Sequence, residues 1–147
     1  MIAIDTSALY AILTNEPEAS SFLRAISSDD APAISALTLY ETMIVCHARG
    51  RDPLLDDLRQ LMLAGNIKTV AFDGQAAEAA HAAYRRFGKG YHPAGLNLTD
   101  CAAYSLAATL GCPLLCKGDD FTKTGIAAAV QVTPGSPGSS VPSGPNP

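Results

Sequence analysis

The sequence predicts an α/β fold in which helices flank a central, mostly parallel sheet. Short apolar runs bounded by turn residues alternate with longer segments in which apolar residues recur at helical spacing. This alternation repeats along the chain, as expected for parallel strands joined by helical connections. The 147 residues, 48% of them hydrophobic, suffice for one domain with a substantial core.

The chain begins with an apolar strand at residues 2–4, and the carboxylate of Asp5 directly follows it. Apolar residues at helical spacing then predict a helix through Leu13, and an apolar stripe over residues 22–26 predicts a second helix that ends near Ser28. The first strand therefore delivers an acidic residue to the start of a helix.

The remaining elements continue the alternation. In order, the sequence predicts a strand at 33–35, helices at 37–49 (stopped by Gly50) and 53–63 (closed by Gly65), a strand at 67–72, helices at 75–87 and 98–110, a strand at 114–116 and an edge strand at 130–132.

The end of the chain has a different composition. From Pro134 to Pro147 nearly every residue is Pro, Gly or Ser, and such a segment cannot bury enough apolar surface to offset its chain entropy. We therefore expect a folded domain at 1–133 and a disordered tail at 134–147.

Composition excludes several classes of protein. No apolar stretch approaches the ~20 residues of a membrane span, and the N-terminus lacks the basic region and cleavage site of a signal peptide, so we expect a cytoplasmic protein without a membrane partner. The net charge of −4 argues against a protein that binds nucleic acid by overall charge. Any contact with nucleic acid would be local or assisted by a cation.

The cysteines do not form a zinc-binding pattern. All lie in Ala- and Leu-rich segments, without C-x-x-C pairs or interspersed histidines: Cys46, Cys101, Cys112 and Cys116. We expect reduced, buried thiols, with a redox pair of Cys112 and Cys116 as the alternative.

Each prominent acidic residue has a local structural explanation. Asp5 can cap the helix that follows it, Glu41 can complete a capping box that starts at Thr38, and Asp100 suits the first turn of its helix. Asp119 and Asp120 lie in a Gly-containing turn, where Asp is common.

Taken together, the same residues suggest a common site. The carboxyl ends of parallel strands open on one edge of a sheet, where ligands bind, and both Asp5 and the pair Asp119–Asp120 follow strands. The helices of Glu41 and Asp100 can begin at that edge. Two like charges ~4 Å apart cost about 4 kcal/mol at an effective dielectric near 20, so such a cluster needs a cation. Oxygen ligands select hard ions such as Mg²⁺ or Mn²⁺, which commonly act on phosphate esters.

Four segments occur in order along the chain: "IAIDTSAL", "ALTLYET", "GLNLTDCAAYSLA" and "PLLCKGDDF". Together they resemble the PIN-domain ribonucleases, specifically the VapC-type toxins of bacterial toxin–antitoxin pairs, and the resemblance runs from Met1 to about Val132. The stretch from Arg85 to Ala107 is similar to one VapC subgroup. The resemblance implies a PIN-like three-layer sandwich and a metal-dependent endoribonuclease.

Carried over by position, the resemblance implies that Asp5, Glu41 and Asp100 bind Mg²⁺ or Mn²⁺ directly or through water. Asp119 is the choice for the fourth catalytic acid; Gly118 stands where the family more often has an acid, so Asp120 is the alternative. Ser7, at the hydroxyl position of the first motif, either orients Asp5 or a water on the metal, or simply begins a helix.

The resemblance also implies partners: an RNA substrate, a cognate VapB-type antitoxin and a second copy of the chain. The early helices, around residues 9–13 and 22–26, are where we expect partner contact. Basic residues near the acids are candidates for the RNA backbone, although each also suits a solvated surface: Arg85, Arg86, Lys89, His92 and Lys117. His47 and His81 are expected to be packing or surface residues.

Three other functions compete with the toxin. One is a PIN nuclease that matures RNA, and another is a PIN-fold binding module without catalysis. The third, a HAD-type phosphotransferase, needs a second Asp two residues after Asp5, where Ser7 stands.

Overall fold

The computed structural model describes residues 1–48 and 53–131, and its centre is a four-stranded parallel sheet. The strand order is β3-β2-β1-β4, so the first strand lies inside the sheet, between the second strand and the last. The strands are β1 (Ala3–Ile4), β2 (Ala33–Ser35), β3 (Lys68–Val70) and β4 (Leu114–Leu115). Their carboxyl ends therefore share one edge, as the sequence predicted.

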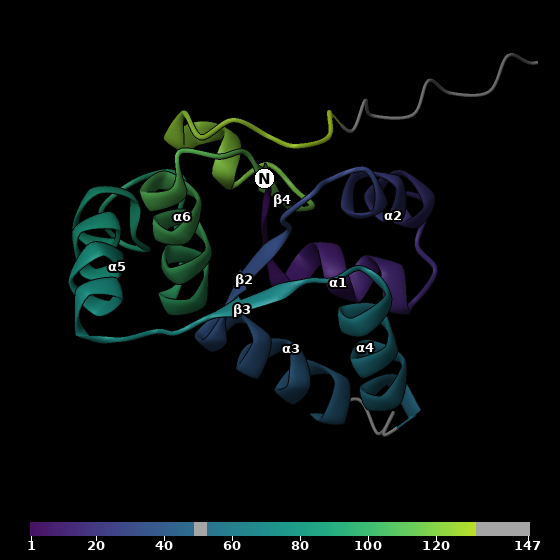
Figure 1. The fold of residues 1–147 in the computed structure, drawn as a ribbon. Helices are drawn as coiled ribbons and strands as arrows, with labels where there is room; N and C mark the ends of the chain where they lie inside the picture. The colour runs from purple at the N-terminus through teal and green to yellow at the C-terminus, as the bar shows by residue number, and fades with distance from the viewer. Residues whose placement is uncertain (49–52, 132–147) are drawn as a thin grey trace, which may run out of the picture.

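Helices cover both faces of the sheet. In Figure 1, α5 and α6 lie on one side of the strands and α1, α2 and α4 lie on the other, while α3 runs below them. The helices are α1 (Thr6–Leu13), α2 (Ala19–Ser27), α3 (Ala36–Ala48), α4 (Pro53–Ala64), α5 (Gly74–Phe87) and α6 (Leu98–Leu110), and a short 3₁₀ helix, η1 (Phe121–Thr124), follows β4. The predicted three-layer α/β sandwich is confirmed.

The core is divided by the sheet into two apolar clusters. Successive strand side chains point to opposite faces, so Ala3 and Leu114 pack with residues of α5 and α6, whereas Ile4 and Leu115 pack with residues of α1, α2 and α4. The strands β1, β2 and β4 are buried on both faces, whereas the edge strand β3 is largely exposed. Burial on both faces explains why the three buried strands are mostly apolar rather than alternating.

Most predicted elements are present, with shifted ends. The helix predicted at 98–110 is found with those bounds, but the strand predicted at 67–72 is shortened to Lys68–Val70. The edge strand predicted at 130–132 is not formed in its described part: Ala128 makes one bridge to Leu114, and Val130 and Gln131 are irregular. Arg49, Gly50, Val132 and the predicted tail at 134–147 lie outside the described residues.

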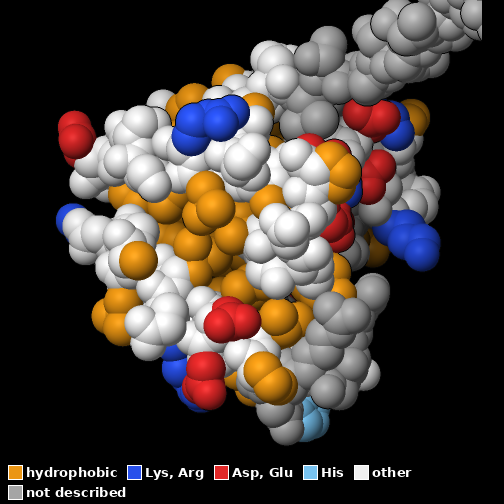
Figure 2. Space-filling model, turned by 90° about the vertical axis from the view of Figure 1, so that its right-hand side faces the viewer, with side chains coloured by type: hydrophobic (Ala, Val, Ile, Leu, Met, Phe, Trp, Pro, Cys, Tyr) orange, Lys and Arg blue, Asp and Glu red, His pale blue; other side chains and the backbone are white. Residues whose placement is uncertain are grey.

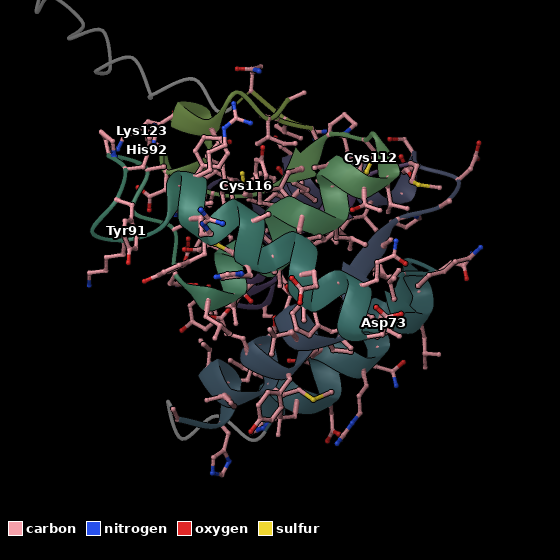
Figure 3. All side chains as sticks on the ribbon, turned by 90° about the vertical axis from the view of Figure 1, so that its left-hand side faces the viewer. Asp73, Tyr91, His92, Cys112, Cys116 and Lys123 are labelled. Atoms are coloured by element: carbon pink, nitrogen blue, oxygen red, sulfur yellow. The ribbon has the colours of Figure 1, made fainter. Side chains whose placement is uncertain are left out.

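All four cysteines are free thiols, as predicted, and Cys46, Cys101 and Cys112 are buried. Cys112 and Cys116 lie beyond opposite ends of β4, so an extended strand separates them (Figure 3). Burial, with a smaller effect of Asp5, raises the pKa of the Cys116 thiol to about 12, which disfavours the reactive thiolate. The geometry does not support a redox pair.

Among the described residues, no helix combines the length and apolarity needed to cross a bilayer.

Candidate active site

Asp5 lies at the carboxyl end of β1, where strand and helix meet. Its backbone N–H donates to the Leu115 carbonyl at 2.9 Å, which continues the pairing with β4. Its side chain then caps α1: Oδ2 accepts the Ser7 N–H at 3.0 Å and the Ser7 hydroxyl at 2.6 Å. The predicted capping role is therefore real, but it occupies only one of the two carboxylate oxygens.

The other oxygen of Asp5 has no hydrogen-bond partner among the described residues. Asp5 is 3% exposed, and Oδ1 is buried. Burial raises the pKa of Asp5 to about 6; the two bonds from Ser7 oppose this rise, and the charges of Asp100 and Glu41 add to it. A buried carboxylate oxygen without a donor is costly, and a cation is the partner that its charge requires.

Glu41 lies in α3 and is held by hydroxyl groups from two other helices. Oε2 accepts the Thr6 hydroxyl at 2.6 Å, and Oε1 accepts the Thr99 hydroxyl at 2.5 Å. Thr38 is inside α3, which begins at Ala36, and its hydroxyl oxygen is buried without a partner among the described residues. The prediction of a capping box between Thr38 and Glu41 is therefore wrong. The Glu41 side chain instead accepts hydrogen bonds from the helices α1 and α6.

Asp100 lies in the first turn of α6, as predicted. Asn97 caps this helix, and Asp100 Oδ2 accepts the Asn97 N–H at 2.8 Å to complete a capping box. Burial raises the pKa of Asp100, and the charges of Glu41 and Asp120 raise it further, against the bond from Asn97. Asp100 is therefore electrostatically coupled to Glu41 and to the loop after β4.

That loop carries the two residues predicted as candidates for a fourth acid, Asp119 and Asp120, and both are exposed. Asp120 is among the charges that raise the pKa of Asp100, and its Oδ1 lies 3.9 Å from Lys123 Nζ. Asp119 lines a separate cavity together with Lys117 and Phe121. Asp120, the alternative that the sequence left open, therefore affects Asp100 by its charge, and the choice between Asp119 and Asp120 as the fourth acid stays a prediction.

The acids are coupled by charge, but they do not form a finished metal cage. Within residues 1–48 and 53–131, no three or more His, Cys, Asp or Glu side chains are clustered tightly enough to hold an ion as they stand. The donor chemistry of the acids nevertheless fits a hard divalent cation, because they offer carboxylate oxygens and Asp5 Oδ1 has no hydrogen-bond partner among the described residues. Asp5 and Asp100 each keep an oxygen that helix capping does not use.

Ser7 connects Asp5 to the loop after β4. Its hydroxyl donates to Asp5 Oδ2 and accepts the backbone N–H of Lys117 at 2.9 Å. Of the two roles predicted for Ser7, the geometry matches the orientation of Asp5.

The predicted cationic residues fall into two groups. Lys117 Nζ is paired with Glu16 and, at 3.2 Å, with Glu18, so much of its charge is already neutralised. Arg85 and Arg86 are exposed in the last turn of α5, and Lys89 is exposed just beyond it. These three lie outside any ion pair found among the described residues and remain available to an anionic ligand.

His92 packs against neighbouring residues, whereas His47 and His81 lie on the surface. His92 packs edge-on against Phe87 with ring centroids 5.2 Å apart, and its Nδ1 accepts the Ala94 N–H at 3.1 Å. Figure 3 shows His92 beside Tyr91 and Lys123 at one corner of the molecule, and Lys123 Nζ donates to the Pro93 carbonyl there. His47 and His81 are exposed on α3 and α5, consistent with the predicted surface role.

Sequence reasoning missed the roles of Thr6 and Thr99. Thr6 belongs to the hydroxyl pair behind Asp5, which is a weak signal. Thr99 is 58 positions from Glu41, and no local pattern connects the two residues.

Comparison with known proteins identifies the family of the chain. The PIN-domain family model matches residues 2–127. A VapC ribonuclease of Mycolicibacterium smegmatis is 44% identical over 127 residues, covering 86% of this chain and 98% of the relative, and ribonuclease VapC30 of Mycobacterium tuberculosis is 44% identical over 126 residues, covering 86% and 96%.

Solved structures share the fold at low sequence identity. Mycobacterium tuberculosis VapC20, described as a sarcin–ricin loop cleaving toxin, matches with a TM-score of 0.70 at 15% identity, over 86% of this chain and 97% of that one. A toxin–antitoxin complex from Klebsiella pneumoniae matches with a TM-score of 0.63 at 20% identity, over 89% and 98%. The chain therefore belongs to the PIN-domain family, in the group of the VapC ribonucleases.

Proposed function

We propose that this protein is a Mg²⁺- or Mn²⁺-dependent endoribonuclease that acts as the toxin of a toxin–antitoxin pair. The observation that carries the proposal is the buried Oδ1 of Asp5, which has no hydrogen-bond partner among the described residues and lies at the carboxyl edge of the sheet, where the charges of Asp100 and Glu41 raise the pKa of Asp5. The relatives at 44% identity, named as VapC ribonucleases, support the choice of RNA as substrate.

The residues divide the chemistry as follows. Asp5 and Asp100 would hold the ion, each with an oxygen that capping leaves free, and Glu41, with Asp120 or Asp119, would supply further carboxylate oxygens directly or through water. Once bound, a divalent ion supplies positive charge that lowers the pKa of water and offsets charge on the phosphate in the transition state. One carboxylate accepts the proton of the attacking water, and Ser7 holds Asp5 in place.

Local positive charge would guide the RNA to this site. The protein is acidic overall, so attraction of the backbone depends on Arg85, Arg86 and Lys89 rather than on net charge. Lys117 contributes less, since Glu16 and Glu18 already neutralise it.

The antitoxin would bind over α1, α2 and α4. Figure 2, which views this side, shows hydrophobic side chains gathered at its centre. Within the ranges predicted for partner contact, Phe22 and Ile26 are core residues and are not accessible, whereas Leu23 is 40% exposed and Ile12 and Leu13 are partly exposed. Leu23→Glu should abolish co-purification with the antitoxin while the free toxin still cleaves RNA.

A second copy of the chain would pack against α3. Tyr40 and Ile44 are 61% and 47% exposed on one helix face, and Leu98 of α6, near Leu37 on the same face, is 65% exposed. Tyr40→Glu should convert a dimer to a monomer in light-scattering measurements. A cytoplasmic location stays a prediction.

The test is incubation of the purified protein with total RNA, with Mn²⁺ or with EDTA, followed by mapping of the cut ends. Asp5→Ala and Asp100→Asn should abolish cleavage with the fold intact, because an Asn at 100 still accepts the Asn97 N–H. Asp56→Asn on the exposed surface of α4 is the matched control. Undiminished cleavage by both site variants would defeat the assignment.

A second measurement separates the toxin from a nuclease that matures RNA. A toxin should arrest growth on expression, and an adjacent reading frame encoding the antitoxin should relieve the arrest. If the wild-type protein cleaves no RNA with any divalent ion, the non-catalytic binding module is the better description.

A further inference from the structure

Glu41 is the one acid of the site whose two carboxylate oxygens are both bound by side-chain hydroxyls of the described residues. Thr6 comes from α1 and Thr99 from α6, so three helices meet at this carboxylate. The bonds, 2.6 and 2.5 Å long, lie at the short end for hydroxyl donors to a carboxylate. Neither threonine carries a charge that would neutralise Glu41.

We propose that Thr99 and Thr6 are positioning residues that hold the Glu41 carboxylate ready for a divalent cation. The proposal rests on the proposed function for the presence of the ion, and it adds the residues that build the Glu41 side of the site.

The two threonine hydroxyls leave acceptor positions free on the Glu41 carboxylate. Each carboxylate oxygen can accept about two hydrogen bonds, and each threonine takes one position on one oxygen. One position on each oxygen therefore stays open to the ion or to a water on it. The two hydroxyls fix the plane of the carboxylate and leave half of its acceptor positions unused.

The two threonines also tie Glu41 to the other acids. Thr6 directly follows Asp5 and Thr99 directly precedes Asp100, so their bonds hold the Glu41 carboxylate at the helix starts that carry those acids. Like charges held near one another repel when no cation is present. An unrestrained glutamate would turn away from the other two acids and lose side-chain order. Hydrogen bonds from Thr6 and Thr99 oppose that movement. The Glu41 side chain therefore loses less conformational freedom when an ion binds.

The Thr99 hydroxyl is a conformationally restricted donor. Thr99 is β-branched, which restricts its χ1 rotation, and its backbone N–H is fixed by the Asn97 cap at 2.8 Å. The Thr99 hydroxyl has one proton and two acceptors within reach, Glu41 Oε1 at 2.5 Å and Asn97 Oδ1 at 2.9 Å. The closer, charged acceptor takes the proton.

The test is calorimetric titration of Mn²⁺ into the metal-free protein, which does not depend on cleavage. Thr99→Val keeps the shape of the side chain and removes the hydroxyl, and it should weaken Mn²⁺ binding about 10- to 100-fold. Thr99→Ser keeps the hydroxyl and should stay much closer to wild type. Thr109→Val, at an exposed position of the same helix, is the matched control and should change nothing.

A double-mutant cycle distinguishes positioning from a general structural effect. If Thr99 acts through Glu41, then adding Thr99→Val to Glu41→Gln should cause little further loss of Mn²⁺ affinity. Thermal melting of each metal-free variant reports whether the fold is retained.

Three outcomes would overturn the proposal: wild-type Mn²⁺ affinity in Thr99→Val, an equal loss in Thr99→Ser, or no Mn²⁺ binding by the wild-type protein. Its failure is distinguishable from failure of the proposed function. If the wild-type protein cleaves RNA but Thr99→Val binds Mn²⁺ as tightly as the wild type, only the positioning role is refuted. If the variants show the expected Mn²⁺ affinities but the wild-type protein cleaves no RNA, only the nuclease function is refuted.

Discussion

The Ser7 hydroxyl donates a hydrogen bond of 2.6 Å to Asp5 Oδ2, two residues before it in the chain. The same hydroxyl oxygen accepts the Lys117 N–H, so one small side chain connects the residue after β1 to the loop after β4. The acid is thus oriented by the segment that also carries Asp120.

We predict that Ser7→Ala lowers kcat/KM for RNA cleavage about 10- to 100-fold, because Asp5 loses an orienting bond that also stabilises its charged form. Loss of that bond raises the pKa of Asp5 further, so the acidic limb of the pH–rate profile should move to higher pH. Ser20→Ala, on the exposed face of α2, is the control. A profile that superimposes on the wild-type one would contradict the prediction.

The raised pKa of Asp5 predicts how stability depends on pH in the metal-free protein. The folded state keeps the Asp5 proton up to about pH 6, whereas the unfolded state releases it near the ordinary pKa of 3.8. Between these values the folded state binds more protons, so stability falls as pH rises, by about 3 kcal/mol over the whole window.

Asp5→Asn removes this cost and keeps an acceptor for Ser7. Metal-free Asp5→Asn should therefore melt several degrees above the wild-type protein at pH 7.5, and the difference should shrink toward pH 4. Excess Mn²⁺ at pH 7.5 should stabilise the wild-type protein and not the variant. Parallel melting curves across the pH range would count against a buried, uncompensated Asp5.

RNA affinity should depend on the end of α5 and not on Lys117. In an Asp100→Asn background that prevents cleavage, Arg85→Gln with Arg86→Gln should weaken binding of an RNA oligonucleotide and lower its salt dependence. The expected change in slope is about 0.7 for each phosphate that the variant no longer neutralises. Lys117→Gln should leave the slope nearly unchanged because Glu16 and Glu18 already hold that charge. Fluorescence anisotropy at several KCl concentrations measures both, and the reverse ranking would refute the assignment.

Gly88 is required where α5 turns into the following loop. A Cβ there would lie 2.4 Å from the Tyr84 carbonyl oxygen and 2.7 Å from its ring, and the carbonyl accepts the Gly88 N–H at 2.8 Å. Gly88→Ala should cost about 1–3 kcal/mol in the free energy of unfolding, because a backbone atom must move. Gly74→Ala, with nothing within 4 Å of the added carbon, should be neutral in the same denaturant titration.

The sheet and the general place of the site could be predicted because both follow from local signals. Short apolar runs identified the strands, and the parallel arrangement placed Asp5 and the loop after β4 at one edge. The cap of α1 was also predictable, because Asp5 directly precedes the helix and accepts one of its first N–H groups. The edge strand at 130–132 failed because a bend replaces it beyond one bridge at Ala128, and no turn residue marks that change.

The finer parts of the site depend on contacts between distant segments. A T-x-x-E pattern is the same whether Thr38 begins a helix or lies within one, so the sequence could not show that Glu41 faces Thr6 and Thr99. The pairing of Lys117 with Glu16 and Glu18 joins residues about 100 positions apart. The choice between Asp119 and Asp120 depends on the direction of a single turn after Gly118, whose φ of +95° lies in the left-handed region.

β1 is paired on one side with β2 and on the other with β4, which follows it by more than 100 residues. The edge that carries the acids therefore needs both the first and the last strand of the sheet. A chain still being translated carries Asp5, Glu41 and Asp100 before the ribosome has released β4, which supplies the neighbour of β1 and the anchor for Ser7. Such a nascent or truncated chain lacks one of the two strands that flank β1 and the backbone N–H that Ser7 accepts. If the proposed nuclease activity depends on this edge, it can arise only after almost the whole domain has been synthesised.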